Sequence, residues 1–187
     1  MLINQIINVD EDFESGDITE PVTLQQVKNY LRLEGFVSDD SGEQEFDFDD
    51  TLIEAMITEG RMWAEKFTGQ YLVPRILNVV LLNQAGKIEL PGPVIGSIVL
   101  TDSEADEIDS GNYDFIGTTY PKLETTFDSR ITATYQAGFT VFPAWVVNTI
   151  KAYVAWAYEH RGDDELPGSP IRAAAIARPY RRVKAWG

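Results

Sequence analysis

The chain has 187 residues, a formal net charge of −15 and no cysteine. The lack of cysteine excludes disulfides and thiolate metal sites, and no run of about 18 apolar residues predicts a membrane-spanning helix. The excess of acid argues against sequence-specific DNA binding, because that binding requires neutralisation of phosphates. The length and a hydrophobic content of 44% predict one domain, or one domain with an inserted subdomain.

The first stretch of the chain predicts an arm and a short helix. Residues 1–20 are acidic after a brief apolar opening, and we expect an extended arm that is ordered only if it pairs with another element. Thr23 is a good N-cap and Gln26 follows three positions later, which together predict a capping box. The helix that begins there should end near Leu33.

An acidic, turn-rich loop leads to a second helix. Residues 36–50 hold several acids, but no glycine stands where a calcium-binding EF-hand loop requires one, so we interpret the segment as a solvated loop. A helix is expected from about Asp50 to Thr68, with Thr51 and Glu54 as a second capping box. Its apolar residues recur at helical spacing and predict a core face.

The middle of the chain changes to β character. Short runs rich in β-branched residues alternate with glycine, proline and asparagine turns between residues 71 and 135, which predicts an antiparallel sheet or small sandwich. The expected strands are 76–82, 87–90, 95–101, 113–116, 122–124 and 131–135. With two helices before it and one long helix after it, this region makes the fold class α+β.

A long apolar helix follows the last strand. Gly138 is expected to end the strand, and Pro143 to start a helix that runs to Arg161. Apolar side chains cover more than one face of this helix, so it lies at the centre of a bundle or packs on both its own core and a partner. The candidates for contact with a neighbouring subunit are Trp145, Tyr153, Trp156 and Tyr158.

The last residues are basic and aromatic. After a polar linker of residues 162–170, residues 171–177 predict a short helix, and Pro179 prevents its continuation. The functional candidates in this segment are Arg172, Arg178, Tyr180, Arg181, Arg182, Lys184 and Trp186. Arginines and aromatics of this kind can bind phosphate or dock into a groove of another protein, and the alternative is a solvated terminus.

No catalytic motif stands out in the sequence. The single histidine, His160, has no candidate nucleophile beside it and is expected to lie at a helix C-terminus. Glycine-rich phosphate loops and a His-Glu-x-x-His motif are absent. We therefore predict a protein that is not an enzyme and binds no cofactor or metal, although the many acids leave a carboxylate pair for glycoside hydrolysis open.

Two groups of residues resemble the head–tail connector (adaptor) proteins of tailed bacteriophages. In the C-terminal half they are Tyr135, Ala137, Gly138, Phe139, Pro143 and the run Tyr158-Glu159-His160-Arg161. In the N-terminal half they are Thr23-Leu24, Lys28, Leu31-Arg32 and Phe67-Thr68-Gly69-Gln70. The resemblance spans roughly residues 21–180, and the β region is similar to that of the longer adaptors, which carry a β subdomain between helical halves.

The resemblance implies a structural virion protein located in the neck between head and tail. Its subunits would form a ring, most often a dodecamer, with the portal protein and a tail-completion or stopper protein as partners. Double-stranded DNA would pass through the ring during packaging and ejection. In such adaptors the C-terminal segment reaches the portal, which makes the basic tail the expected portal-docking arm. Assembly would occur in the host cytoplasm, and no membrane is implied.

These expectations divide the chain into four parts: an N-terminal arm (1–20), a helical core (21–70 and 136–162), an inserted β subdomain (71–135) and a C-terminal linker and basic arm (163–187). Acidic loops that faced the channel would repel DNA phosphates and let the genome slide. The candidate channel-lining acids are Asp39, Asp40, Asp47, Asp49, Asp106 and Asp109. The alternative function is a non-enzymatic binding module, or a tail-associated protein, that recognises a ligand through its β subdomain.

Overall fold

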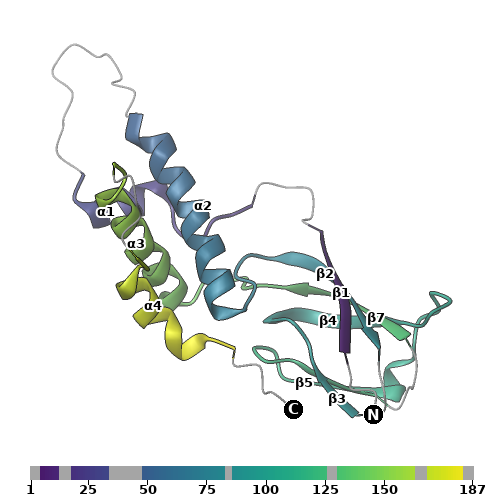
Figure 1. Cartoon of the computed structure of the whole chain (residues 1–187). Helices are drawn as coiled ribbons and strands as arrows, with labels where there is room; N and C mark the ends of the chain where they lie inside the picture. Colours follow the sequence, from purple (N-terminus) through teal and green to yellow (C-terminus); the bar gives the residue numbers. More distant parts are fainter. Residues whose placement is uncertain are drawn as a thin grey trace. The chain divides into compact units, whose positions relative to one another are not determined.

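The computed structural model describes residues 5–12, 18–33, 48–82, 86–125, 130–162 and 168–182. The chain divides into a sheet unit, Met1–Thr19 with Gln70–Val141, and a helical unit, Glu20–Gly69 with Phe142–Gly187. Among the described residues there are four α-helices and two antiparallel sheets, so the α+β class predicted from the sequence is confirmed. Figure 1 labels the helices and most of the strands.

The sheet unit contains two antiparallel sheets that share one core. The larger sheet has the strand order β1 (Gln5–Asp12), β2 (Arg75–Leu82), β7 (Arg130–Ala137) and β4 (Val94–Thr101). The smaller sheet has the order β3 (Gly86–Glu89), β6 (Lys122–Thr125) and β5 (Tyr113–Ile116). Leu77, Leu100 and Ile131 of the larger sheet and Leu123 of the smaller one lie in a single buried cluster. Burial alternates along β2 and β7, as it does in strands that cover a core with one face.

The beginning of the chain forms a strand of this unit. Residues 5–12, which we expected in an N-terminal arm, form β1 and pair antiparallel with β2 from Gln5 opposite Leu82 to Asp12 opposite Ile76. The condition that we set for order in this segment, pairing with another element, is therefore met within the chain itself. Among the strands that the structure describes, β1 lies at the edge of the sheet and has β2 as its neighbour.

The end of β7 depends on a glycine. Gly138 has a φ of +130°, and a Cβ atom at this position would lie 2.5 Å from the carbonyl oxygen of Val73. Its N–H donates to the carbonyl of Pro93 over 2.9 Å. A side chain is excluded here both by the backbone angle and by the close approach of another backbone. The prediction that Gly138 ends the strand is confirmed.

The described residues of the helical unit form four helices and a short 3-10 segment. They are α1 (Leu24–Leu31), α2 (Phe48–Thr68), α3 (Ala144–Glu159), α4 (Ile171–Ala177) and η2 (Arg178–Tyr180). α2 packs against α3, and α3 packs against α4 (Figure 1). The fully buried side chains between them include Val27, Ile53, Val146, Ile150 and Val154.

One predicted capping box is present and the other is wrong. Thr23 Oγ1 accepts a hydrogen bond from the N–H of Gln26 over 3.2 Å, and Gln26 Oε1 accepts one from the N–H of Thr23 over 3.4 Å. α2 begins at Phe48, so Thr51 lies inside the helix and does not cap it. Acids in the first turn of α2 instead meet the positive end of the helix dipole.

Candidate interaction surfaces

The C-terminal segment packs on the helical unit as far as Arg182. Ala177 of α4 is fully buried. The Tyr180 ring stacks on Trp145, with centroids 4.4 Å apart and planes 9° apart. The backbone N–H of Arg182 donates to the carbonyl of Thr68 over 2.7 Å. The last carbonyls of a helix lack partners within the helix, so this contact caps the C-terminal end of α2.

The described part of the predicted docking arm is therefore folded and not an extended tail. It holds Arg172, Arg178, Tyr180, Arg181 and Arg182, whereas Lys184 and Trp186 lie outside the described residues. Arg172, Arg178 and Arg181 are exposed. The guanidinium of Arg181 lies 5.6 Å from the ring centroid of Phe67, and that of Arg172 lies 5.9 Å from the ring centroid of Tyr30. Docking on a portal stays a prediction for these residues.

A string of aromatic rings runs along α2 and α3. Ring centroids lie 4.9 Å apart for Phe67 and Trp63, and 5.7 Å apart for Trp63 and Tyr153. The string continues from Tyr153 to Trp156 over 5.7 Å and from Trp156 to His160 over 5.6 Å. All five side chains are half-buried. Aromatic pairs at such separations add stability beyond the area that they bury, so the string joins the two helices.

The predicted subunit-interface residues make contacts within the helical unit. Those residues are Trp145, Tyr153, Trp156 and Tyr158, and all are half-buried. The Tyr158 hydroxyl donates to Asp49 over 2.5 Å, and the Arg161 guanidinium lies 4.0 Å from the Tyr158 ring centroid. Burial raises the pKa of the Tyr153 hydroxyl, and the negative charge of Glu59 raises it further. A role of these four aromatic residues in contacts between subunits stays a prediction.

The predicted channel-lining acids fall in different places. Asp39, Asp40 and Asp47 lie outside the described residues. Asp49 accepts the hydrogen bond from Tyr158 on α3. Asp106 and Asp109 are exposed in the loop that joins β4 to β5. A single subunit has no channel, so channel lining stays a prediction.

The β4–β5 loop presents carboxylates without cations. Asp102 Oδ1 accepts hydrogen bonds from the N–H groups of Glu104 and Asp106 over 2.8 and 3.0 Å, which folds the loop back on itself. The exposed acids along this loop and the following strand are Glu104, Asp106, Glu107, Asp109 and Asp114. No lysine or arginine occurs from Asp102 to Asp114. Across the described ranges, no ion pair involves any of these exposed acids.

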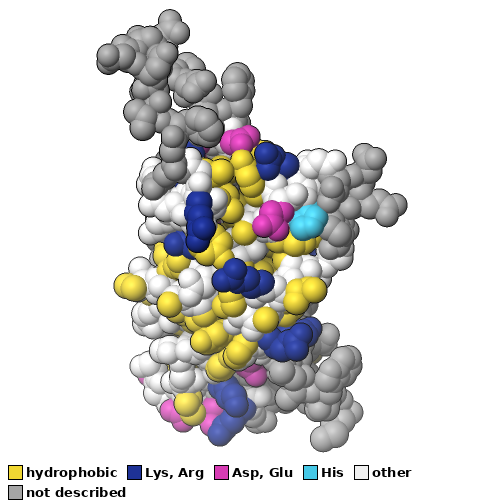
Figure 2. Space-filling model, turned by 90° about the vertical axis from the view of Figure 1, so that its left-hand side faces the viewer, with side chains coloured by type: hydrophobic (Ala, Val, Ile, Leu, Met, Phe, Trp, Pro, Cys, Tyr) yellow, Lys and Arg dark blue, Asp and Glu magenta, His cyan; other side chains and the backbone are white. Residues whose placement is uncertain are grey.

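The two units differ in their balance of charge. Counting only residues that the structure describes, the helical unit has ten lysines and arginines against seven acids, whereas the sheet unit has four against eleven. Figure 2 shows the side on which α1, α3 and α4 lie in Figure 1, and there hydrophobic and cationic side chains are interspersed over the helices. Among the described residues, the excess of acid is therefore concentrated in the sheet unit.

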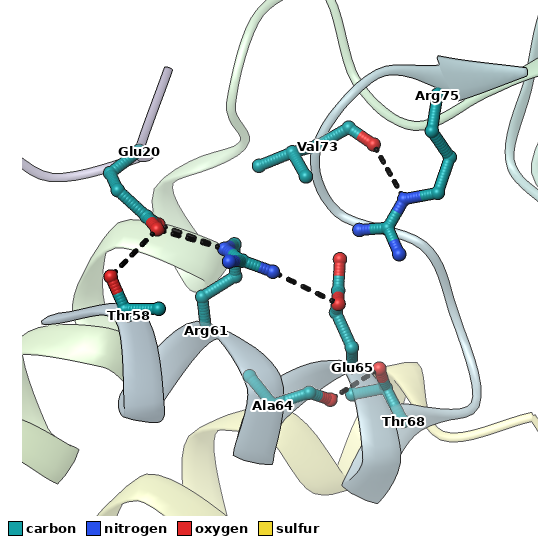
Figure 3. Close-up of polar contacts among 8 residues, drawn as sticks. All are labelled: Glu20, Thr58, Arg61, Ala64, Glu65, Thr68, Val73 and Arg75. Atoms are coloured by element: carbon teal, nitrogen blue, oxygen red, sulfur yellow. Dashed lines mark hydrogen bonds and ion pairs between the residues drawn. The ribbon is translucent and has the colours of Figure 1, made fainter. Parts of the chain in front are cut away.

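A buried arginine ties the start of the helical unit to α2. Arg61 is 5% exposed, and its Nε donates to the two carboxylate oxygens of Glu20 over 2.9 and 3.1 Å. Its Nη1 donates to Glu65 over 3.3 Å, and Thr58 Oγ1 donates to Glu20 over 3.1 Å (Figure 3). We did not predict this network from the sequence. The sequence feature that could have indicated the network is the position of Arg61 three residues before buried Ala64, on the core face of α2.

Neither a metal site nor a membrane span is found in the described part of the chain. In those ranges, no three histidine, aspartate or glutamate side chains are arranged so that they could hold a metal ion. The described helices are too short or too polar to cross a bilayer. His160 Nδ1 lies 2.6 Å from the carbonyl oxygen of Trp156 and donates to it, because a carbonyl can only accept.

Comparison with known proteins identifies the fold. No protein-family model and no curated protein matches the chain. A chain of the "Neck of empty GTA particle computed with C6 symmetry" superposes with a TM-score of 0.69 at 18% identity, covering 97% of this chain and 98% of that one. A chain of the "Virion of native gene transfer agent (GTA) particle" gives 0.67 at 17% identity, covering 96% and 97%. A chain of the "Neck of native GTA particle computed with C12 symmetry" gives 0.60 at 18% identity, covering 74% and 86%.

Proposed function

We propose that this chain is a structural subunit of the neck of a tailed-phage-like particle, where copies form a ring between the portal and the tail. The observation that carries the proposal is the similarity of fold to a chain of a particle neck over 97% of this chain and 98% of that one. A match of that extent includes both units, and not only a common helical or sheet motif.

Two further observations support the proposal. The neck structures with similar chains are described with sixfold and twelvefold symmetry, which agrees with a ring built from copies of one chain. The motifs around Thr23, Phe67, Gly138 and Tyr158 resemble head–tail adaptors in the same order along the chain. As a neck subunit, the protein acts by assembly and not by catalysis, and double-stranded DNA passes through its ring.

The packing of α4 alters how docking on the portal must be tested. Removal of residues 170–187 would take away Ala173 and Ala177, both of which are fully buried. This deletion would therefore disrupt the helical core as well as remove the docking residues. Deletion of residues 183–187 leaves all of these contacts in place. We propose that these last residues contribute to portal docking, as expected of a C-terminal arm in the adaptor family.

The test mixes the purified protein with the purified portal of its own particle, followed by negative-stain imaging. We expect rings that cap the portal, and fewer of them after deletion of residues 183–187. Rings that survive the deletion would keep the neck role and move the docking contact elsewhere. If the full chain does not associate with the portal at all, the neck role is wrong and a binding module becomes the better description.

A further inference from the structure

The end of the helical unit presents cations and apolar groups together. We name this surface the C-terminal basic face and define it by Ile171, Arg172, Arg178, Tyr180 and Arg181. Ile171 is 82% exposed and Tyr180 is 39% exposed. The three arginines are exposed, and none of them has an ion pair with a carboxylate within the described ranges. Figure 2 shows dark-blue and yellow side chains side by side on the helical unit.

This face is held in place by the chain beneath it. Ala173 and Ala177 anchor α4 in the core, Tyr180 stacks on Trp145, and the Arg182 N–H is bonded to the Thr68 carbonyl. A partner that binds here therefore meets a preformed surface, and little ordering of the backbone opposes binding.

The sheet unit presents the opposite chemistry. We name this surface the acidic edge and define it by Glu104, Asp106, Glu107, Asp109, Asp114 and Ile116. Its carboxylates are exposed and have no ion pair among the described residues, although Asp109 Oδ1 accepts a hydrogen bond from the N–H of Gly111 over 2.7 Å. Ile116 is 52% exposed. β5, which carries Asp114 and Ile116, is at the edge of the smaller sheet as far as the described strands go. Acids around an exposed isoleucine are the complement of arginines around an exposed isoleucine and tyrosine.

We propose that the C-terminal basic face of one copy binds the acidic edge of a second copy of this chain. Two basic faces would place cations against cations, and two acidic edges would place acids against acids, so neither surface is suited to pair with itself. A contact between unlike surfaces is heterologous, and repeated heterologous contacts produce a ring when their rotation closes. Closure into a ring rests on the proposed function, whereas the pairwise contact does not.

Charge also explains why contact between copies of so acidic a chain needs this face. Two copies with a net charge of −15 repel one another as a whole. At an ionic strength of about 0.15 M the screening length is about 8 Å, so distant charges interact weakly while groups in contact still attract. The basic face supplies attraction at the contact itself. This assigns Asp106 and Asp109 to a subunit contact, whereas a channel-lining role would leave association unchanged on their substitution.

Cysteine cross-linking tests the contact directly, because the chain has no cysteine of its own. Ala175→Cys lies on the exposed side of α4 within the basic face, and Ser103→Cys lies exposed beside Glu104. Neither substitution changes a charge. The two single variants are mixed and oxidised mildly, and the disulfide-linked dimers are identified by mass. Asn148→Cys, exposed on α3 of the same helical unit, replaces Ala175→Cys in the control mixture.

We expect the mixed 175–103 dimer to exceed both homodimers and the 148–103 control by about fivefold, and to fall toward the control in about 1 M salt. A mixed dimer at the level of the control overturns the proposal. A dominant 175–175 dimer also overturns it, because that product indicates a symmetric contact.

A charge swap gives an independent result with residues kept on the surface. One variant carries Arg178→Glu and Arg181→Glu, and the other carries Asp106→Lys and Glu107→Lys. Each alone should lose association in sedimentation, since like charges then meet, and an equal mixture should regain it. Failure of the mixture to associate, with unchanged circular dichroism of both variants, overturns the proposal. Rings on the portal without the 175–103 disulfide would overturn only this contact, and the disulfide without portal binding would overturn only the neck role.

Discussion

The sheet unit and the helical unit stabilise themselves in different ways. The sheet unit encloses aliphatic side chains such as Leu77 and Leu123 between two sheets and turns acids outward. The helical unit joins its helices by stacked aromatic rings, by a buried arginine network and by small alanines of α4. The same chain thus carries a surface rich in carboxylates and a surface rich in guanidinium groups, which is the asymmetry that a head-to-tail contact uses.

The two units can also be observed separately. All four tryptophans fall within the residue ranges of the helical unit, and none falls in the sheet unit. Tryptophan fluorescence therefore follows unfolding of the helical unit, whereas circular dichroism in the far ultraviolet follows both units. Each prediction below relies on this pair of signals.

The largest effect is expected at the end of β7 in the sheet unit. Gly138→Ala would place a Cβ atom 2.5 Å from the carbonyl oxygen of Val73, so backbone must move. We expect the free energy of unfolding to fall by about 4 kcal/mol. Gly96→Ala is the matched control, since Gly96 also has a positive φ but no atom within 4 Å of the new Cβ. It should cost about 1 kcal/mol, and equal costs in urea titrations would show that the contact with Val73 is absent.

The next effect is expected in the helical unit at Arg61. Arg61→Ala removes the guanidinium that pairs with the carboxylate of Glu20 and one bond to Glu65, and we expect a loss of about 3 kcal/mol, seen by tryptophan fluorescence. Lys87→Ala provides the comparison in the sheet unit, because its ion pair with Glu124 is solvent-exposed. That change should cost less than about 0.5 kcal/mol. A loss at Arg61 as small as that at Lys87 would contradict a buried network.

A smaller effect is expected where the C-terminal segment meets α3. Tyr180→Ala removes the ring stacked on Trp145, and we expect a loss of about 2 kcal/mol together with a changed tryptophan emission. Ile171→Ala is the control, since a side chain that is 82% exposed contributes little to folding. If Tyr180→Ala behaves like Ile171→Ala, residues 178–182 are not packed on the helical unit in solution.

The smallest effect concerns pH. The raised pKa of Tyr153 means that the folded state keeps the hydroxyl proton above pH 10.0, the ordinary value, where the unfolded chain releases it. The free energy of unfolding therefore falls as pH rises above that value. Tyr153→Phe lacks this loss, so its stability should decline less between pH 9 and pH 11 in urea titrations. Identical pH profiles for both proteins would contradict the burial of this hydroxyl.

Local signals in the sequence predicted most of the fold. The Thr23 and Gln26 spacing predicted the start of α1, and glycine at position 138 predicted the end of β7, because these features depend on a few neighbouring residues. The capping box at Thr51 was wrong because α2 begins earlier, at Phe48, where acids in the first turn serve the helix end instead. Spacing alone cannot distinguish a true N-terminal capping box from the same residues occurring by chance inside a helix.

Contacts between distant residues were the part that the sequence did not reveal. Glu20 and Arg61 are 41 positions apart, and the bond between Arg182 and Thr68 joins the end of the described chain to α2. The basic composition of residues 172–182 was correctly identified, but composition alone did not show that this segment packs on its own unit. Tertiary contacts decide such cases, since the same residues suit a free tail equally well.

The order of elements along the chain has a consequence for synthesis on the ribosome. α2 ends at Thr68, and its partner α3 begins only at Ala144, after every later strand of the sheet unit has been made. At about 5–20 residues per second, the apolar face of α2 waits several seconds for the helix that covers it. During that time the nascent chain exposes Ile53 and Ile57, which become buried in the finished protein. The position of residues 70–141 between the two segments of the helical unit thus also creates an interval in which chaperones can bind α2.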